Sequence, residues 1–161
     1  MDQNAEPKPK RECESRTEQI QIVMPGDTNG NGRLFGGRLA AWIDVVAAVS
    51  ARRHSGREVT TVSIQNLHFK SPAYVNETVV LIGRVIFTGR TSVEVRVDTY
   101  AEKLCGERNV INTAYIIMVA LDENEMPARV PRLLIETEEQ QREWDDCKKR
   151  REIFRGRNWK E

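Results

Sequence analysis

Residues Leu39 to Val49 are all apolar except Asp44, and this short segment restricts the possible folds more than any other part of the chain. A helix that is apolar around its whole circumference is normally buried. The rest of a chain of 161 residues must therefore surround it. We expect this helix to end near Gly56, a residue type that suits a helix C-terminus.

The strand-like segments of the chain are joined by short connections. They span residues 19–23 before the helix and residues 59–69, 78–87, 92–100 and 110–121 after it. Parallel strands need a crossover of about a dozen residues or more, so short connections favour an antiparallel sheet. The apolar phase of the 59–69 segment changes near Gln65 and Asn66, which predicts a β-bulge there. The pattern predicts an α+β fold in which an antiparallel sheet wraps around one long central helix.

The two ends of the chain differ from this central unit. Residues 1–15 are polar and charged without periodicity, which predicts a disordered arm. We assign 16–127 to the globular domain and 128–161 to a charged C-terminal extension, with a helix over residues 136–155. Opposite charges four residues apart favour that helix. The expected ion pairs are Glu138–Arg142, Asp145–Lys149 and Asp146–Arg150.

Charge and cysteine content argue against several classes of function. The net charge of +1 gives no overall attraction to nucleic acid. Cys13, Cys105 and Cys147 are an odd number without the spacing of a zinc site, so neither a disulfide framework nor a metal site is expected. No secretory signal or apolar run of membrane-spanning length is visible, which predicts a cytoplasmic protein with no membrane partner.

Asp44 is the first candidate for a functional residue. Carboxylates are rarely buried unless a partner neutralises them or the protein uses them. The helix positions three and four residues away offer no cation, because they are Ala40, Ala41, Ala47 and Ala48. A structural partner from elsewhere in the fold is the alternative. We favour a functional role, because the small neighbours also leave space for a ligand.

The glycine-rich loop before the helix contains further candidates. Gly36 and Gly37 leave N–H groups free at the helix start, where they could stabilise an oxyanion or simply permit close packing. Asn29 could position water and substrate, although capping of a turn explains it better when it is taken alone. The loop opens like a calcium-binding EF-hand, but its twelfth position is Arg38 rather than glutamate, which excludes calcium.

Two groups of basic residues could contact phosphate. Residues Lys148 to Arg151 form a dense positive cluster, although such clusters are most often solvated helix faces. Arg90 lies in a predicted turn between two strands, together with Thr91 and Ser92. Aromatic residues do not alternate with either group, which argues against RNA binding.

Together these segments resemble the acyl-CoA hydrolase group of the hotdog-fold thioesterases, which includes the bacterial YciA-like enzymes and the cytosolic acyl-CoA thioester hydrolases. The similarity spans roughly Thr17 to Leu121. The segments that carry it are Asp27-Thr28-Asn29, Leu34-Phe35-Gly36-Gly37, Trp42-Ile43-Asp44, Val59-Thr60-Thr61-Val62, Phe69-Lys70-Ser71-Pro72 and Gly89-Arg90-Thr91-Ser92, with Gly32, Leu39 and Glu94.

The resemblance implies the hydrolysis of acyl-CoA to a free acid and CoA, with no cofactor apart from the CoA of the substrate. It also implies dimers with a continuous sheet and active sites at the dimer interface, and the assembly of such dimers into trimers of dimers. Asp44 would act as general base on water or as nucleophile. Gly37, with Gly36, would hold the thioester carbonyl, and Asn29 would act across the interface.

The resemblance also implies a binding surface for CoA. Arg90, Thr91 and Ser92 match the turn that contacts CoA in relatives. On the C-terminal helix, Lys148 and Arg151 could reach the CoA phosphates.

Two other functions stay open. One is a different reaction of the same fold, such as hydration of an enoyl-CoA, which usually pairs the aspartate with a nearby histidine; no histidine lies between Asp27 and Val49. The other is a non-catalytic module that binds CoA or a nucleotide through the basic C-terminal helix. Arg33 and Arg38 stand where relatives often carry uncharged or acidic residues, and they could serve CoA phosphates or acyl selectivity.

Overall fold

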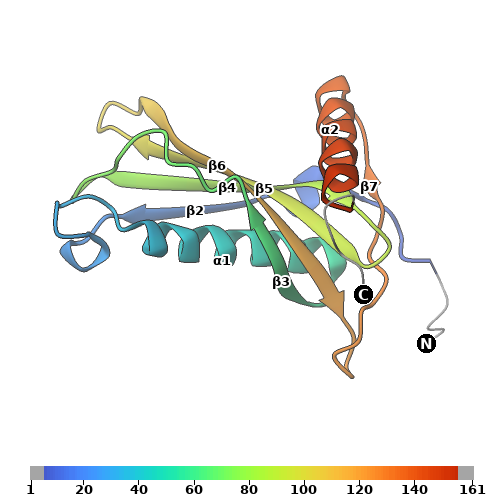
Figure 1. The fold of residues 1–161 in the computed structure, drawn as a ribbon. Coiled ribbons are helices and arrows are strands. Elements are labelled where there is room, and N and C mark those ends of the chain that lie inside the picture. Colours follow the sequence, from blue (N-terminus) through green and yellow to red (C-terminus); the bar gives the residue numbers. More distant parts are fainter. Residues whose placement is uncertain (1–5, 156–161) are drawn as a thin grey trace.

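A curved antiparallel sheet surrounds one long helix, α1 (Gly36–Ser55), in the computed structural model, which describes residues 6–155 (Figure 1). The strands of this sheet are β2 (Thr17–Ile22), β3 (Glu58–Gln65), β4 (Thr78–Thr88), β5 (Ser92–Glu102) and β6 (Arg108–Leu121). Their spatial order is β2-β4-β5-β6-β3, so β2 and β3 are the edges. The predicted α+β fold, with an antiparallel sheet wrapped around a central helix, is confirmed.

The concave face of the sheet and one side of α1 form the core. Gly83 allows β4 to approach the helix closely, because a Cβ atom at this position would lie 2.8 Å from Val46 Cγ1 and 2.7 Å from Ser50 Oγ. Each large apolar side chain buried in this way stabilises the fold by about 1.5–3 kcal/mol. The buried side chains at this contact include Leu39, Ile43, Leu81, Val95, Ile116 and Met118.

One side of α1 is not covered by its own chain. Val45 is 53% exposed, Ala41 is exposed and Asp44 is only half-buried. The expectation of a helix buried on every side is therefore wrong for the single chain, because the sheet stops at β3 and leaves this stripe open. The helix end was predicted correctly, since Gly56 is the C-cap and has the left-handed φ of 67° that favours glycine.

The bulge of β3 lies at a different place from the one predicted. The pairing of β3 with β6 shifts between Thr61 and Ser63, which leaves Val62 as the extra residue. The strand ends at Gln65, and Asn66 has a φ of 59°. The apolar residues beyond it therefore belong to the loop before β4 and not to the strand, and Phe69 in this loop packs against the start of α1 at Gly36.

The N-terminal segment is partly ordered. β1 (Lys10–Arg11) pairs in parallel with β7 (Leu133–Leu134), and the short 3-10 helices η1 (Glu12–Glu14) and η2 (Pro25–Asp27) flank β2. The expected disordered arm over 1–15 is therefore wrong for residues 10–14, because Lys10 and Arg11 pair with β7 and the next three residues form η1. Residues 1–5 lie outside the described part of the chain.

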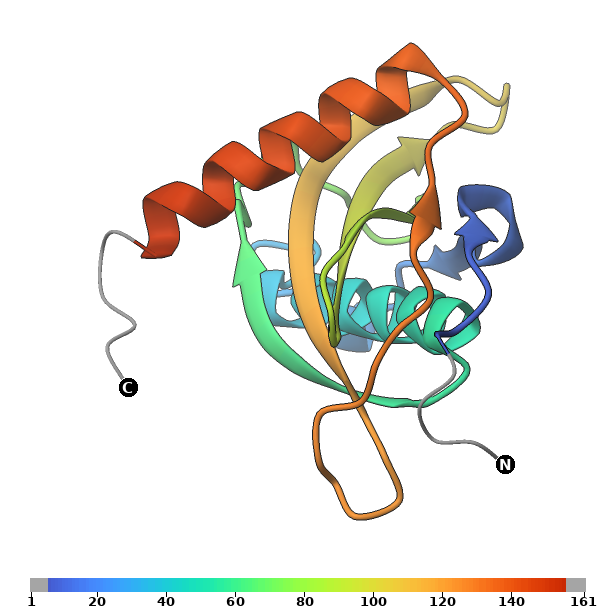
Figure 2. The ribbon, with the colours of Figure 1, turned by 90° about the vertical axis from the view of Figure 1, so that its right-hand side faces the viewer.

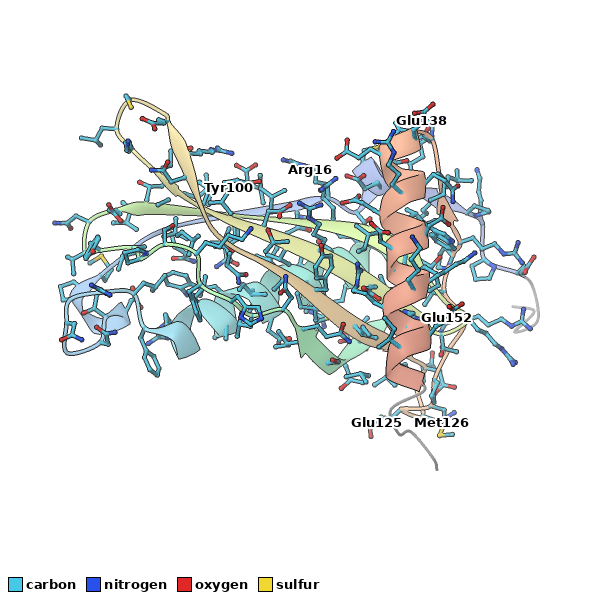
Figure 3. All side chains as sticks on the ribbon, turned by 45° about the horizontal axis from the view of Figure 1, so that its top comes forward. Arg16, Tyr100, Glu125, Met126, Glu138 and Glu152 are labelled. Atoms are coloured by element: carbon cyan, nitrogen blue, oxygen red, sulfur yellow. The ribbon has the colours of Figure 1, made fainter. Side chains whose placement is uncertain are left out.

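The C-terminal helix α2 (Glu138–Arg155) lies on the convex face of the sheet, opposite α1 (Figure 2). Glu138 and Glu152 mark its two ends in Figure 3, and Glu125 and Met126 lie in the loop after β6. Of the expected ion pairs, Glu138–Arg142 is present at 3.4 Å. The other two do not form: Lys149 pairs with Asp146, and Arg150 turns inward to Glu94 in the sheet. Among the described residues, no helix has the length and apolar character that crossing a membrane requires.

Candidate functional site

Asp44 lies on the open side of α1 and faces the edge strand β3. Thr61 Oγ1 donates a hydrogen bond of 2.7 Å to Asp44 Oδ1, which fixes the orientation of the carboxylate and leaves its second oxygen free. Within residues 6–155 the carboxylate has no ion-pair partner within 4.0 Å. No cation from elsewhere in residues 6–155 therefore neutralises Asp44, which was the structural alternative to a functional role.

The surroundings of Asp44 are apolar but open to solvent. Val45 directly follows Asp44 on α1, and Val62 and Ile64 follow Thr61 on β3; these three side chains are 53%, 50% and 38% exposed. Exposed apolar side chains that cluster around one carboxylate are typical of a surface that another molecule covers.

The start of α1 has free backbone donors. The carbonyl of Phe35 accepts hydrogen bonds from the amides of Arg38 and Leu39, at 3.0 and 3.1 Å. The amides of Gly36 and Gly37 have no backbone acceptor among the described residues. They are therefore available to an anion, and the helix dipole favours negative charge at this position. A Cβ atom on Gly37 would lie 2.6 Å from the ring of Phe35, so a larger residue here would displace this exposed side chain.

Asn29 makes the turn-capping contacts that its sequence context predicts. Its Oδ1 accepts hydrogen bonds from the amides of Asn31 and Arg33, at 2.9 and 3.3 Å. The Nδ2 group of the same side chain makes no hydrogen bond within the described part of the chain and is free to donate to a ligand. A capping role and a ligand contact are thus compatible in one side chain.

A cavity of about 430 Å³ brings Asn29 and Gly36 together. Arg33 also lines it, so one of the two unusual arginines of this loop reaches the cavity, whereas Arg38 pairs with Asp27 at 3.1 Å. The remaining lining residues are Leu34, Leu39, Phe69, Lys70, Ser71, Pro72, Ala73 and Ile111.

Asp44 does not line this cavity. Asp44 lies seven positions after Gly37 along the helix, which corresponds to a rise of about 10 Å. Asp44 and the free amides at the start of α1 are therefore separate features of this chain.

The predicted CoA-binding residues lie near one another at the β4–β5 turn and α2. Arg151 donates hydrogen bonds to Ser92 Oγ at 3.2 Å and to Glu94 at 3.1 Å, and its guanidinium lies 4.3 Å from the Phe87 ring centroid. Lys148 lies over the Trp144 ring, at 5.9 Å from its centroid. Arg90 is exposed and Thr91 is half-buried. Arg151 and Ser92 therefore already hold each other, whereas Arg90 and Lys148 reach solvent.

A buried carboxylate anchors α2 to the sheet. Glu94 is 1% exposed and accepts hydrogen bonds from Arg150, Arg151 and the thiol of Cys147 at 2.8 Å. Burial, followed by the negative charge of Glu94, raises the pKa of the Cys147 thiol to about 12. Cys147 is therefore protonated at neutral pH and acts as a hydrogen-bond donor.

Two residues that matter to these arrangements were not among the predicted site residues. Thr61 and Glu94 both belong to segments that carry the family resemblance, but nothing in the local pattern indicates that Thr61 meets Asp44 or that Glu94 is buried. Both contacts join segments that are distant in the sequence, by 17 residues for Thr61 and by 53 to 57 for Glu94.

Comparison with known proteins identifies relatives of this chain. The model of the thioesterase superfamily matches residues 31–104. The uncharacterized acyl-CoA thioester hydrolase YkhA of Bacillus subtilis (strain 168) is 41% identical over 128 residues, which is 79% of this chain and 74% of the relative. Among solved structures, a hexameric acyl-CoA thioesterase in its apo form superposes with a TM-score of 0.86 at 38% identity, over 93% of this chain and 97% of the other.

A second solved structure contains ligands. The acyl-CoA hydrolase from Staphylococcus aureus, in complex with butyryl-CoA, CoA and CoA disulfide, gives a TM-score of 0.84 at 29% identity, over 92% of this chain and 91% of the other. That hydrolase has also been solved with an aspartate, an asparagine or a threonine replaced by alanine.

Proposed function

This chain belongs to the thioesterase superfamily, and we propose on that basis that it hydrolyses acyl-CoA thioesters to a free carboxylic acid and CoA. The observation that carries the mechanism is the Asp44 carboxylate, which Thr61 orients at 2.7 Å and no cation neutralises among the described residues. An oriented, unpaired carboxylate beside an apolar surface is suited to take a proton from water.

In the proposed reaction, Asp44 removes a proton from a water molecule, and the resulting hydroxide attacks the carbonyl carbon of the thioester. The amides of Gly36 and Gly37 stabilise the oxyanion of the tetrahedral intermediate. The C–S bond then breaks, and the proton held by Asp44 passes to the sulfur of CoA. A thioester is reactive enough that one carboxylate and a backbone donor suffice without a triad.

Asp44 could alternatively attack the carbonyl itself and form a mixed anhydride. A single turnover in water labelled with heavy oxygen addresses this point. With water as nucleophile, the label enters the free acid and the peptide that contains Asp44 keeps its mass. A labelled Asp44 peptide would show that the carboxylate is the nucleophile.

We propose that two chains complete each site. The distance of about 10 Å along the helix between Gly37 and Asp44 supports this arrangement, because the oxyanion donors and the base must come from different chains to reach one carbonyl. The open apolar surface around Asp44 is the surface that the partner would cover. Dimers assembled into a trimer of dimers agree with the hexameric state of the apo acyl-CoA thioesterase.

The residue types also agree with those changed in a relative. Asp44, Asn29 and Thr61 supply an aspartate, an asparagine and a threonine, which are the three types replaced by alanine in the Staphylococcus aureus hydrolase. The free thiols of Cys13, Cys105 and Cys147 support a cytoplasmic location, where cysteines stay reduced.

The proposal is tested by thiol release from acyl-CoAs that range from acetyl to palmitoyl, with wild type and Asp44→Asn. We expect kcat to fall by about 10³-fold or more in Asp44→Asn, because the amide cannot accept the proton, while CoA still binds. Asp146→Asn, an exposed aspartate of α2, is the matched control and retains wild-type kcat. Tight CoA binding by calorimetry without thiol release from any acyl-CoA would instead indicate a binding module. A decrease in the enoyl absorbance of crotonyl-CoA would indicate a hydratase.

A further inference from the structure

The cavity of about 430 Å³ at the start of α1 is lined by two cations that the proposed hydrolysis does not use. Arg33 belongs to the loop before α1, and Lys70 belongs to the loop between β3 and β4. Gly36, whose free amide is proposed above to hold the thioester carbonyl, lines the same cavity. Among the residues that line it within 6–155, none is acidic. An acyl group attached to that carbonyl therefore lies close to two positive charges.

Hydrogen bonds of the backbone fix the two loops that carry these cations. The amide of Leu34, which follows Arg33, donates to the carbonyl of Ala73 at 2.7 Å. The Lys70 amide donates to the carbonyl of Ile111 in β6 at 2.8 Å. Both cations therefore extend from segments that are attached to the rest of the fold, and their separation from the start of α1 is set by the structure.

The described part of the chain does not neutralise the two charges. Neither Arg33 nor Lys70 has an ion-pair partner within 4.0 Å among residues 6–155, whereas Arg38 in the same loop pairs with Asp27 at 3.1 Å. Asn29 adds a further donor to the cavity, because its Oδ1 already accepts two amides and its Nδ2 is free in this part of the chain. The free polar groups of these three side chains are all hydrogen-bond donors, which is the arrangement that a carboxylate requires.

The rest of the cavity wall suits a short carbon chain. Leu39 and Ile111 are buried apolar residues of this wall, and Phe69 packs against Gly36. An uncharged acyl chain would bring methyl groups to the two cations and displace their water, which is unfavourable. A carboxylate at the end of the chain, ionised above a pKa of about 4.3 as in glutamate, replaces that water with ion pairs.

We propose that this cavity selects acyl groups that end in a carboxylate, so that the preferred substrates are CoA thioesters of short dicarboxylic acids. The inference rests on the proposed hydrolase function, which supplies the thioester. Arg33 and Lys70 bind the distal carboxylate while the thioester carbonyl lies at the Gly36 amide. Three Cα–Cα steps of about 3.8 Å place Arg33 within about 11 Å of Gly36, so an acyl chain of a few carbon atoms and the arginine side chain span the separation. Water and the thioester give a dicarboxylic acid and CoA, and the distal carboxylate takes no part in bond breaking.

The test compares glutaryl-CoA with pentanoyl-CoA, whose acyl groups have equally many carbon atoms and differ in the terminal carboxylate. In wild type, kcat/KM for glutaryl-CoA is expected to exceed that for pentanoyl-CoA by about tenfold, because hydrogen bonds between charged groups are strong. Arg33→Gln is expected to bring this ratio to about one, and Lys70→Gln is expected to lower it about threefold, since an exposed lysine contributes less. Arg33→Lys keeps the charge and is expected to retain part of the preference. Arg142→Gln, an arginine of α2 outside the cavity, is the matched control and keeps the wild-type ratio.

The same two acyl groups on pantetheine, which carries no phosphate, distinguish acyl selection from a contact with the phosphates of CoA. The preference for the glutaryl group, and its loss in Arg33→Gln, are expected to persist on this carrier. The proposal would be overturned by an equal fall of kcat/KM for both acyl-CoAs in Arg33→Gln that is absent with both pantetheine thioesters. A wild-type enzyme that hydrolyses pentanoyl-CoA as well as glutaryl-CoA or better would also overturn it.

A failure of the hydrolase function is recognised separately, through binding without turnover. Calorimetry compares the S-carboxybutyl thioether of CoA with the S-pentyl thioether, neither of which can be hydrolysed. Wild type is expected to bind the carboxylate-bearing thioether more tightly, and Arg33→Gln is expected to bind both equally. This binding preference without thiol release from any acyl-CoA would refute the hydrolase and support the assignment of the cavity, whereas equal binding of the two thioethers by wild type would overturn that assignment.

Discussion

At the scale of single residues, the hydrogen bond between Thr61 and Asp44 is the contact on which the proposed chemistry depends most directly. Asp44 comes from a helix and Thr61 from the edge strand that follows it, and the hydroxyl is the one described donor to the carboxylate. A carboxylate that is held by one hydrogen bond has one preferred orientation, and loss of that hydrogen bond lets the carboxylate rotate.

Thr61→Val is therefore expected to lower kcat by about 10- to 100-fold with little change in KM, because a hydrogen bond to a charged group contributes about 1.5–3 kcal/mol. Thr61→Ser keeps the hydroxyl and is expected to restore most of the activity. Thr60→Val, at the adjacent exposed position, serves as the control for changes to the strand. Wild-type kcat in Thr61→Val would show that Thr61 does not orient the base.

The burial of His54 leads to a prediction of how the stability of the protein depends on pH. The side chain is fully buried, with Nε2 at 3.2 Å from the carbonyl of Pro131 and Nδ1 at 3.3 Å from Ser15 Oγ. Burial lowers the pKa of His54 below its usual value, against the opposing effect of the Pro131 carbonyl. The unfolded chain therefore takes up a proton at a pH where the folded protein does not.

The direction in which stability changes with pH follows from this difference in proton binding. Stability contributed by neutral His54 is complete above the ordinary histidine pKa of about 6.5 and decreases as the pH falls below it. We expect the Tm of wild type to fall between pH 7.5 and about 5, and the fall to be smaller in His54→Gln, which cannot titrate. His68→Gln is the control for the second histidine. An identical pH slope in wild type and His54→Gln would contradict the assignment.

At the scale of elements, Glu94 determines where α2 lies. Three donors on the buried side of α2, from Cys147, Arg150 and Arg151, meet this one carboxylate of β5. The basic cluster of the helix is thus divided: Arg150 and Arg151 bind the sheet, while Lys148 and Lys149 face solvent. The same cluster that the sequence offers as a phosphate site is therefore in part the attachment of the helix.

Glu94→Gln is expected to destabilise the protein by about 3 kcal/mol, because it leaves two partly buried guanidinium groups without their counter-charge. The measurement is urea unfolding, with Glu152→Gln on the exposed side of α2 as the control. Alkylation of Cys147 gives a second readout: the thiol is protonated and buried in wild type and reacts slowly, and it is expected to react faster in Glu94→Gln. Equal unfolding free energies for the two variants would show that the buried cluster does not stabilise the helix position.

At the scale of the whole molecule, the proposed division of the reaction site between two chains predicts that activity requires a dimer. β3 is a sheet edge with exposed Val62 and Ile64, and a lysine at such an edge opposes pairing with a second copy. Val62→Lys is expected to yield monomers in sedimentation and to abolish thiol release. Ile20→Lys, on the opposite edge strand β2, is the matched control and is expected to leave both properties intact. A monomeric Val62→Lys protein with full activity would contradict a shared site.

Complementation tests the same idea without disturbing the interface. Asp44→Asn and Asn29→Ala damage different halves of the proposed reaction site. A mixed dimer of the two variants therefore regains one intact site if the two halves come from different chains. Random mixing at equal amounts is then expected to recover about a quarter of wild-type activity, since half of the dimers are mixed and each has one working site. No recovery in verified mixed dimers would place both halves in one chain.

Much of this architecture follows from the sequence alone, for physical reasons that are local. Alternation with a period of two predicts the strands, and the short connections predict their antiparallel order. The apolar run from Leu39 to Val49 predicts the central helix. The position of Asp44 in that run marks it as unusual, because no residue within helical reach can neutralise it. Gly56 as a helix end follows in the same way from its freedom to adopt a positive φ.

Tertiary structure alone decided which distant groups meet. The hydroxyl that orients Asp44, the carboxylate that binds Arg151, and the lysine that shares a cavity with Arg33 all depend on strand register, on loop position and on the face to which α2 attaches. A bulge at Val62 sets that register, and a sequence pattern places such a residue only approximately. The open side of α1 also depends on where the sheet ends. The apolar sequence of α1 predicts that other residues cover the whole helix. The structure shows that the sheet ends at β3 and leaves the side of α1 that carries Asp44 uncovered by the same chain.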